Sequence, residues 1–279
     1  MTESDNNFTT TTLTRLGGKK SGEQSDSITV EEPLEIRLGY TDPIKGKTHK
    51  SLSITMRTPG DDINLVCGFL YSESIIRHVE DIASIDDDTD NVIRVELKDD
   101  ISFDQLRLER HFYTTSSCGV CGKASLDALS TSGFDVLLDN SFSISRQNLF
   151  QLSDRLRQKQ SLFELTGGCH GVATFNSNGD IVTVAEDVGR HNAMDKLVGS
   201  MLRARLLPMQ DMGIIVSGRA SFELMQKALA AGCPMLAAVG APSSLAIELA
   251  QEFNIALVGF LKQSTCNIYH LPSGHIGLA

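Results

Sequence analysis

Two early segments of the chain alternate apolar and polar residues, which is the pattern of half-buried β-strands. They cover residues 34–38 and 52–56, and a third such segment covers residues 93–97. Ahead of the third segment, the pair Asp61-Asp62 predicts a helix N-terminus, because aspartate side chains accept hydrogen bonds from the first free amides of a helix. We therefore expect a small α+β domain over residues 31–115.

The second half of the chain is periodic over longer stretches. Leucines recur with helical spacing over residues 149–156, and a β-hairpin is predicted over 172–184 around the turn signal Asn178-Gly179. Apolar runs of a few residues then alternate with helical patterns, which indicates a largely parallel sheet buried on both faces. We expect a larger α/β domain over residues 141–279. Its remaining predicted helices cover 190–203, 221–231 and 244–252, and its strands cover 214–216, 235–239 and 255–261.

Two other segments have compositions that predict little regular structure. Residues 1–30 consist mainly of Ser, Thr, Asn, Gly and Lys with isolated apolar residues, which predicts a disordered tail. Residues 116–140 contain a Ser/Gly-rich loop with two cysteines, followed by a short helical stretch. We place the boundary between the two domains in this linker.

Charge and composition exclude several classes of protein. The 279 residues are 41% hydrophobic and carry a net charge of −10, which argues against bulk binding to nucleic acid or to an anionic membrane. No apolar run approaches the roughly 18 residues of a membrane helix. The N-terminal residues resemble neither a secretory signal nor a transit peptide, so we expect a cytoplasmic protein. In that compartment the six cysteines are expected to be thiols, metal ligands or catalytic groups rather than disulfides.

The sharpest local motif is Cys118-Gly119-Val120-Cys121, which precedes Lys123 at the start of a predicted helix. A helix N-terminus and a nearby ammonium both stabilise a thiolate, so either cysteine can act as a nucleophile. The alternatives are a pair of structural zinc ligands or two inert thiols in a loop. Thioredoxin-like disulfide exchange fits less well, because the chain has no Trp beside the motif.

Zinc chemistry is the main competing interpretation of the cysteines. The run His78-Val79-Glu80 ahead of Cys118 and Cys121 is similar to the signature of zinc deaminases. However, Ser117 stands where that signature has proline, and a solvated histidine beside acidic residues is the ordinary explanation of His78. The pair Cys169-His170 could complete a metal site with the two cysteines, although adjacent ligands rarely reach one tetrahedral ion. We expect no structural metal.

A second polar constellation covers residues 186–196, with the sequence EDVGRHNAMDK. His191 and Asp195 are four residues apart on a predicted helix, so the carboxylate can orient the imidazole. Arg190 can bind a phosphate or a carboxylate with two hydrogen bonds. The ordinary alternative is a helix N-terminus that carries salt bridges.

A third constellation, Ser217-Gly218-Arg219-Ala220-Ser221, lies between a predicted buried strand and a helix. Free amides, hydroxyls and a guanidinium meet there, which suits a phosphate or pyrophosphate. The run Gly240-Ala241-Pro242-Ser243-Ser244 has the same context, and Lys262 follows the next strand. Together these loops predict a nucleotide-like ligand, although each alone is also ordinary turn chemistry.

These motifs occur together and in one order, with Leu165-Thr166-Gly167-Gly168-Cys169-His170 between the first and the second. On these motifs the chain resembles FdhD, the formate dehydrogenase accessory sulfurtransferase family. The likeness runs from about Glu32 to Tyr269. It implies a homodimeric sulfur carrier that accepts persulfide sulfur from a cysteine desulfurase. The sulfur then passes to the molybdenum cofactor, in its bis(guanine dinucleotide) form, for the maturation of formate dehydrogenase.

The resemblance also implies a fold and a set of functional residues. The larger domain is expected to be similar to cytidine deaminase, with three layers and a mixed sheet but without the zinc site. The persulfide residue of the family falls on Cys118, and its second cysteine falls on Cys121. The cofactor-binding segment of the family falls on Phe260, Leu261, Lys262, Gln263, Ser264 and Thr265. Many relatives have a Gly-Arg pair at the last two positions, so Lys262 is the cation of this segment here.

The two lines of reasoning combine into one expected mechanism. A Cys118 thiolate takes the outer sulfur of the donor persulfide and presents it to molybdenum. Arg190, Arg219 and Lys262 are expected to bind the pyrophosphates of the cofactor, with His191, Ser217 and Gly218 beside them. The alternative from another class is a chaperone that only holds the cofactor, with a structural CxxC motif.

Overall fold

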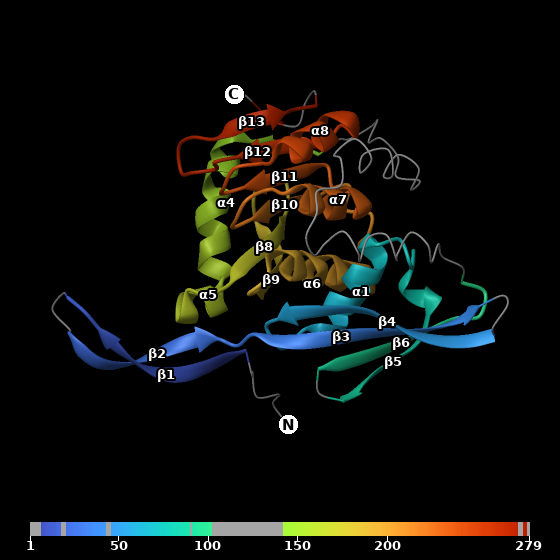
Figure 1. The fold of residues 1–279 in the computed structure, drawn as a ribbon. Coiled ribbons are helices and arrows are strands. Elements are labelled where there is room, and N and C mark those ends of the chain that lie inside the picture. Colours follow the sequence, from blue (N-terminus) through green and yellow to red (C-terminus); the bar gives the residue numbers. More distant parts are fainter. Residues whose placement is uncertain are drawn as a thin grey trace.

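The computed structural model describes residues 7–17, 21–42, 46–89, 91–101, 142–272 and 276–277. This part of the chain folds into two larger sheets with helices packed against them, a separate two-stranded ribbon and a pair of very short strands (Figure 1). The helices are α1 (Asp62–Ser72), a 3-10 turn (Val79–Asp81), α4 (Arg146–Lys159), α5 (Ser161–Thr166), α6 (Arg190–Arg203), α7 (Phe222–Ala230) and α8 (Ser244–Glu252). The strands of the larger sheet are β8 (His170–Phe175), β9 (Ile181–Asp187), β10 (Gly213–Val216), β11 (Met235–Ala238), β12 (Ala256–Gly259) and β13 (Asn267–His270).

The larger sheet has six strands in the order β13-β12-β11-β10-β8-β9. Strands β10, β11 and β12 are parallel, because each is joined to the next by a helix. Strands β8 and β9 form an antiparallel hairpin, and β8 pairs antiparallel with β10. The sheet is therefore mixed, with a parallel centre and antiparallel edges, which agrees with the predicted α/β class.

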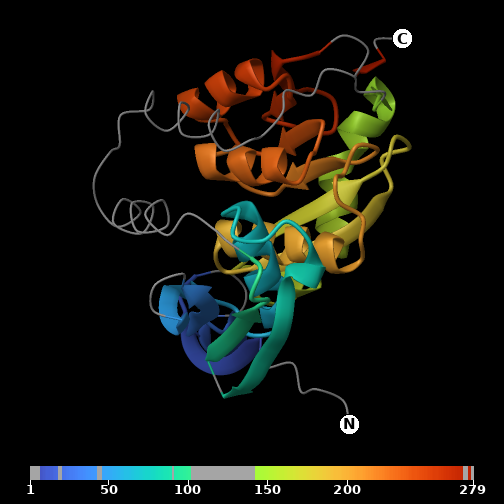
Figure 2. The same ribbon diagram turned by 90° about the vertical axis from the view of Figure 1, so that its right-hand side faces the viewer.

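Helices cover both faces of this sheet, as Figure 2 shows. On one face, Val172, Ile214 and Leu236 pack in one buried cluster with side chains of α6, α7 and α8. On the other face, Ala173, Ile215 and their neighbours pack against the leucines of α4. Because side chains alternate across a strand, each short apolar run supplies both cores. This alternation produces the three layers.

The smaller sheet has the order β4-β3-β6-β5, and α1 lies on its inner face. Its core joins Leu34, Ile36 and Leu38 of β3 to the apolar side chains of α1. The sequence predicted β3, β4, β6 and α1 but not β5. The strands are β3 (Glu32–Asp42), β4 (Gly46–Arg57), β5 (Ile82–Thr89) and β6 (Val92–Leu97). Two more short strands, β7 (Ile144–Ser145) and β14 (Ile276–Gly277), pair with each other.

Helix α1 of the smaller unit crosses α6 of the larger unit at very close range. A Cβ atom on Gly68 would lie 1.9 Å from the carbonyl oxygen of Asp195. A Cβ atom on Gly199 would lie 1.8 Å from the carbonyl oxygen of Asn64. Both positions therefore require glycine, and the two helix backbones touch. This crossing fixes the smaller sheet relative to the larger one.

The prediction of a disordered tail over residues 1–30 was wrong for most of its length. β1 (Phe8–Arg15) and β2 (Gly22–Thr29) form an antiparallel hairpin that projects from the body of the protein (Figure 1). At its base, the hydroxyls of Thr29 and Thr166 lie 2.6 Å apart. The low hydrophobicity of this segment suggested disorder. Its threonines, however, are β-branched and favour extended backbone.

Candidate ligand site

The larger sheet brings the predicted polar loops to one edge. Strands β9, β10, β11 and β12 all end there, and β8 begins there, because it runs antiparallel to β10. In open α/β sheets, ligands bind at this edge. We call it the carboxyl edge. It consists of Cys169-His170, the loop 187–191, the loop 217–221, the loop 239–243 and the segment 260–265.

Backbone hydrogen bonds continue between these loops beyond the strands. The amide of Ser217 donates to the carbonyl of Gly171 at 2.9 Å, and the amide of Gly171 donates to the hydroxyl of Ser217 at 2.9 Å. The amide of Gly240 donates to the carbonyl of Gly218 at 2.9 Å, and Phe260 donates in turn to Gly240 at 3.0 Å. The loops are thus held in a fixed stack across β8, β10, β11 and β12. Such an edge is rigid before any ligand binds.

Arg190, His191 and His170 meet where β8 and β9 reach the carboxyl edge. Burial lowers the pKa of His170, and the charges of Arg190 and His191 lower it further. A Cβ atom on Gly218 would lie 3.3 Å from Nδ1 of His170, so the imidazole lies against the loop after β10. His170 therefore joins the two predicted polar motifs. Its sequence context had suggested only a metal ligand.

His191 has a different carboxylate partner from the predicted one. Its Nε2 lies 2.7 Å from the carboxylate of Glu223 in the first turn of α7, and 3.4 Å from the hydroxyl of Ser221. The hydrogen bond and charge of His191 lower the pKa of Glu223. Asp195 instead receives a 2.7 Å hydrogen bond from Lys227, and both side chains are buried. The predicted pairing of His191 with Asp195 was wrong, because Asp195 faces α7 rather than the helix N-terminus.

Two features of the carboxyl edge favour an anionic ligand. The first is its side chains: Arg190 lies there, and Arg219 and Lys262 are exposed there. The second is that α6, α7 and α8 all begin at this edge, so their N-terminal dipole ends point to it. The Nε atom of Arg190 is buried and has no hydrogen-bond partner in the described part of the chain. The residue as a whole is partly exposed, so an anionic ligand can reach the guanidinium through its terminal nitrogens.

The segment 260–265 forms the far end of the carboxyl edge. Phe260 has a left-handed backbone, with φ of 50°, and its side chain is 42% exposed. Lys262 closes a tight turn, because its amide donates to the carbonyl of Thr265 at 2.9 Å. The Gln263 side chain donates to Asp154 of α4 at 2.9 Å, which ties the segment to the opposite helix layer. Phe260 and Lys262 are the side chains of this segment that suit a ligand.

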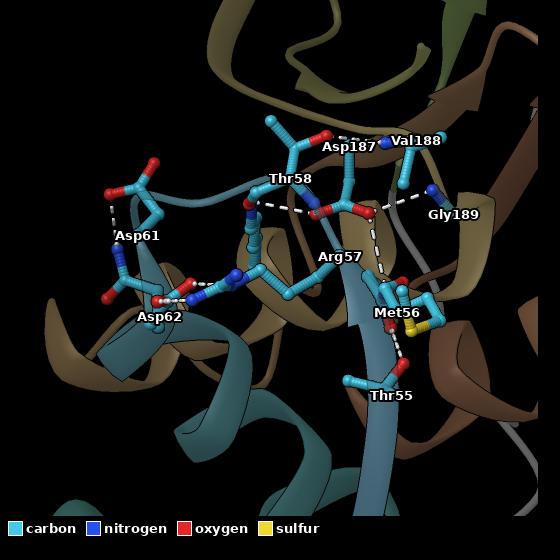
Figure 3. Close-up of polar contacts among 12 residues, drawn as sticks. Thr55, Met56, Arg57, Thr58, Asp61, Asp62, Asp187, Val188 and Gly189 are labelled. Carbon is cyan, nitrogen blue, oxygen red and sulfur yellow. Dashed lines mark hydrogen bonds and ion pairs between the residues drawn. The ribbon is translucent and has the colours of Figure 1, made fainter. Parts of the chain in front are cut away.

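Most of the 186–196 constellation binds protein groups instead of facing the site. Asp187, which is fully buried, accepts hydrogen bonds from the amides of Thr58 at 3.1 Å and Gly189 at 2.8 Å, as Figure 3 shows. Lys196 lies 2.8 Å from the Asp187 carboxylate and donates to the carbonyl of Thr58 at 2.8 Å. Asn192 donates to the carbonyl of Met56 at 2.7 Å. These residues attach β4 of the smaller unit to α6.

Glu186 has a structural role as well. It accepts hydrogen bonds from the amides of Leu162 and Phe163, both at 2.9 Å, and so caps the N-terminus of α5. The Cys169 thiol donates to the same carboxylate at 3.4 Å. Burial and this carboxylate raise the pKa of Cys169 to about 12, so the thiol stays protonated at neutral pH. Cys169 is therefore unsuited to act as a nucleophile.

The predicted sulfur-binding residues Cys118 and Cys121 lie outside the described residues. The candidate zinc residues His78 and Glu80 are described, and they lie in a polar turn of the smaller unit where Glu80 pairs with Arg205. Across the described residues, no three His, Cys, Asp or Glu side chains are grouped closely enough to hold a metal ion. None of the helices in the same part of the chain combines the length and the hydropathy that a membrane crossing needs.

Sequence reasoning missed the contributions of Thr58, His170 and Glu223. Thr58 belongs to a loop of the smaller unit, more than a hundred residues before Asp187 in the chain. Glu223 follows the Ser217–Ser221 motif by two residues, and that proximity is the one signal that could have suggested it as a partner for His191.

Known proteins similar to this chain support the resemblance noted from the motifs. The model of the FdhD/NarQ family matches residues 29–275. The sulfur carrier protein FdhD of Streptomyces coelicolor is 48% identical over 254 residues, which cover 88% of this chain and 87% of that protein. The protein of the same name from Saccharolobus solfataricus is 40% identical over 257 residues, covering 92% of this chain and 94% of the relative.

A solved structure shares the fold. It is the crystal structure of a candidate formate dehydrogenase accessory protein from Desulfotalea psychrophila, with a TM-score of 0.70 and 23% identity. The alignment covers 96% of this chain and 98% of that one. The fold of this chain is thus found in that protein as well. With the family match over nearly all of the described fold, these comparisons confirm the resemblance, and the chain belongs to the FdhD/NarQ family.

Proposed function

We propose that this protein is a sulfur carrier for the maturation of formate dehydrogenase. It accepts sulfur on Cys118 and delivers it to a molybdenum cofactor bound at the carboxyl edge. The observation that carries this proposal is the convergence of Arg190, Arg219 and Lys262 with three helix N-termini on one rigid edge. Sulfur transfer is suggested by the names of the relatives, which are sulfur carriers, and by the CxxC motif. The carboxyl edge provides a place where the cofactor that receives the sulfur can bind.

The loading step is a thiol exchange. The Cys118 thiolate attacks the outer sulfur of the persulfide on a cysteine desulfurase, and the desulfurase cysteine leaves as a thiolate. The product is a Cys118 persulfide, and the step is redox-neutral because one sulfur–sulfur bond replaces another. For delivery, the Cys121 thiolate attacks the inner sulfur of that persulfide. This forms a Cys118–Cys121 disulfide and releases the terminal sulfur as sulfide, and a cellular thiol then reduces the disulfide.

The substrate on the delivery side is the bis(guanine dinucleotide) form of the cofactor. Each of its two pyrophosphates needs cationic and amide donors, which the carboxyl edge supplies. The exposed ring of Phe260 is suited to stack on a guanine base, since aromatic side chains commonly hold nucleobases in this way. The protein has a net negative charge, so it binds this anionic ligand through the positive groups of the carboxyl edge rather than through its overall charge.

We also propose the partners, the oligomeric state and the cellular compartment of this protein. The partners are a cysteine desulfurase and a formate dehydrogenase, the protein is a cytoplasmic homodimer, and the larger unit is related to cytidine deaminase. A native mass spectrum reads the oligomeric state directly. It also distinguishes this function from a zinc site formed by the two cysteines, because bound zinc would add its mass.

The experiment that tests the proposal is an intact mass after incubation with a cysteine desulfurase and free cysteine. We expect a gain of sulfur mass that a thiol reductant reverses and that Cys118→Ala abolishes. Cys266→Ala is the matched control, because it removes a half-exposed thiol elsewhere in the chain and should leave the gain intact. A protein that takes up no sulfur but still binds the cofactor would be a chaperone, and the proposal would be wrong.

A further inference from the structure

Thr58 of the smaller unit is bound by the larger unit through every polar group that it has. Its amide donates to Asp187 at 3.1 Å, and its carbonyl accepts from Lys196 at 2.8 Å. Its hydroxyl accepts from the amide of Val188 at 3.0 Å. Thr58 is 1% exposed, so water does not substitute for these partners. Figure 3 shows Thr58 facing the turn formed by residues 187–189.

This arrangement constrains the turn more tightly than an ordinary strand-to-helix connection. The side chains of Asp187 and Lys196 are 0% and 3% exposed, and a buried charge is costly unless its partners are in place. Asp187 also accepts a hydrogen bond from the amide of Gly189 at 2.8 Å. The backbone of the turn is thus held from the smaller unit through Val188 and from the larger unit through Gly189.

The next residue after this turn is Arg190, the first residue of α6. Its backbone position is set by Val188 and Gly189, and it lies at the carboxyl edge near His170. Other groups in this loop are committed to protein partners: Asp187 and Asn192 to the smaller unit, and His191 to Glu223. Arg190 is partly exposed, and among the described residues no hydrogen bond or ion pair engages its guanidinium. Arg190 is therefore the group of the loop that a ligand can use.

We infer that Thr58 is a positioning residue that sets Arg190 for the pyrophosphate of the ligand, so that the smaller unit controls binding at a site it does not touch. This inference rests on the proposed function, because it takes the ligand to carry a pyrophosphate. The effect of Thr58 passes from its hydroxyl to the amide of Val188, and from Val188 to Arg190 at the start of α6. A loss of the hydroxyl leaves a partly buried amide without an acceptor, and the turn relaxes to find another.

The test is a calorimetric titration of the whole protein with inorganic pyrophosphate, using Thr58→Val and Thr58→Ser. Valine has the shape of threonine without the hydroxyl, and serine keeps the hydroxyl. We expect Thr58→Val to weaken pyrophosphate binding about tenfold, and Thr58→Ser to bind within about twofold of the wild type. Thr41→Val is the matched control, because its hydroxyl donates to Asp99 at 2.8 Å within the smaller unit, away from α6.

A second control separates positioning from a general loss of stability. Val95 is fully buried in the core of the smaller sheet, so Val95→Ala destabilises the protein by leaving a cavity. We expect Val95→Ala to lower the melting temperature at least as much as Thr58→Val while pyrophosphate binding stays unchanged. If Val95→Ala weakens binding as much as Thr58→Val, or if Thr58→Val binds like the wild type, the inference is wrong.

The same proteins distinguish a failure of this inference from a failure of the proposed function. Sulfur loading from the desulfurase is measured in parallel by intact mass, and Thr58→Val should load sulfur normally. Absent loading in the wild type would contradict the proposed function, while the titration would still report on Thr58. A wild type that loads sulfur but binds no pyrophosphate would overturn this inference and the placing of the ligand at the carboxyl edge, while the sulfur-loading step would stand.

Discussion

The ammonium of Lys196 lies 2.8 Å from the carboxylate of Asp187, in an environment where the two side chains are 3% and 0% exposed. The pair joins the second turn of α6 to the end of β9, and both residues also bind Thr58 of the smaller unit. Among the described residues, the Asp187 carboxylate has four hydrogen-bond or ion-pair partners, so its buried charge is well compensated. The two sheets are thus joined by a polar contact as well as by the α1–α6 crossing.

Lys196→Met is expected to destabilise the protein strongly, because it leaves the Asp187 charge buried without its cation. Breaking a buried pair in this way costs about 3–5 kcal/mol of unfolding free energy. Urea denaturation followed by circular dichroism measures the loss. Lys159→Met, at an exposed position in the last turn of α4, is the control and should change stability by less than about 0.5 kcal/mol.

The double variant Asp187→Asn with Lys196→Met sharpens this prediction. An asparagine has no charge to leave unpaired, so it should recover part of the stability that Lys196→Met loses. If Lys196→Met alone costs less than about 1 kcal/mol, the pair contributes little and the interpretation fails.

Gly199→Ala tests the crossing of α1 and α6. Alanine favours a helix by about 1 kcal/mol over glycine, but the added Cβ would lie 1.8 Å from the carbonyl oxygen of Asn64. The backbones must separate, so we expect a net loss of about 1–3 kcal/mol, as in overpacked cores. Ser200→Ala at the next position is the control. A variant of Gly199 that is as stable as the wild type in thermal denaturation would contradict the close contact.

The sequence predicted those elements whose side-chain pattern matches their burial. Residues 34–38 of β3 alternate between core and surface, and the apolar residues 214–216 and 235–238 are all buried. Strand β5 escaped prediction, because its run of aspartates lies on an edge strand that is held mainly by backbone pairing to β6. The β1–β2 hairpin escaped for a similar reason, since most of its residues are exposed and its composition resembles that of a tail.

The candidate site was predictable to the extent that its residues are consecutive. Arg190, His191 and the Ser217–Arg219 run were identified as motifs, and the sheet places them on one edge. Their partners were not predictable, because Glu223 and Thr58 come from elements whose register is set by tertiary packing. Sequence spacing suggested Asp195 for His191, yet the rotation of α6 turns Asp195 toward Lys227. Sequence spacing identifies which residues are neighbours on one helix. It does not show which side of that helix another helix packs against.

Arg219→Ala is expected to weaken the binding of guanine nucleotides about tenfold, because an exposed guanidinium at the end of β10 is lost from the carboxyl edge. Fluorescence titration with a labelled GDP measures the change. Arg205→Ala is the matched control, since Arg205 is an exposed arginine beyond the opposite end of α6, where it pairs with Glu80. Equal affinities of Arg219→Ala and the wild type would remove Arg219 from the site.

His170 gives the stability of the protein a defined dependence on pH. Burial, followed by the charges of Arg190 and His191, lowers its pKa below the ordinary value of 6.5. In the unfolded chain the imidazole binds a proton more readily, so acid favours unfolding. The contribution of His170 to stability is therefore complete above about pH 6.5 and is lost as the pH falls through the lower pKa of the folded state.

His170→Gln should remove this contribution, because glutamine does not titrate. We expect the unfolding free energy of the variant to fall less steeply than that of the wild type when the pH is lowered from about 6.5 to about 5, in urea denaturation at each pH. His78→Gln, which removes an exposed imidazole of the smaller unit, is the control. Parallel pH profiles for His170→Gln and the wild type would mean that His170 is not held neutral beside Arg190. A neutral His170 matters for the site, because it leaves Arg190 as the charge that meets the ligand on this part of the edge.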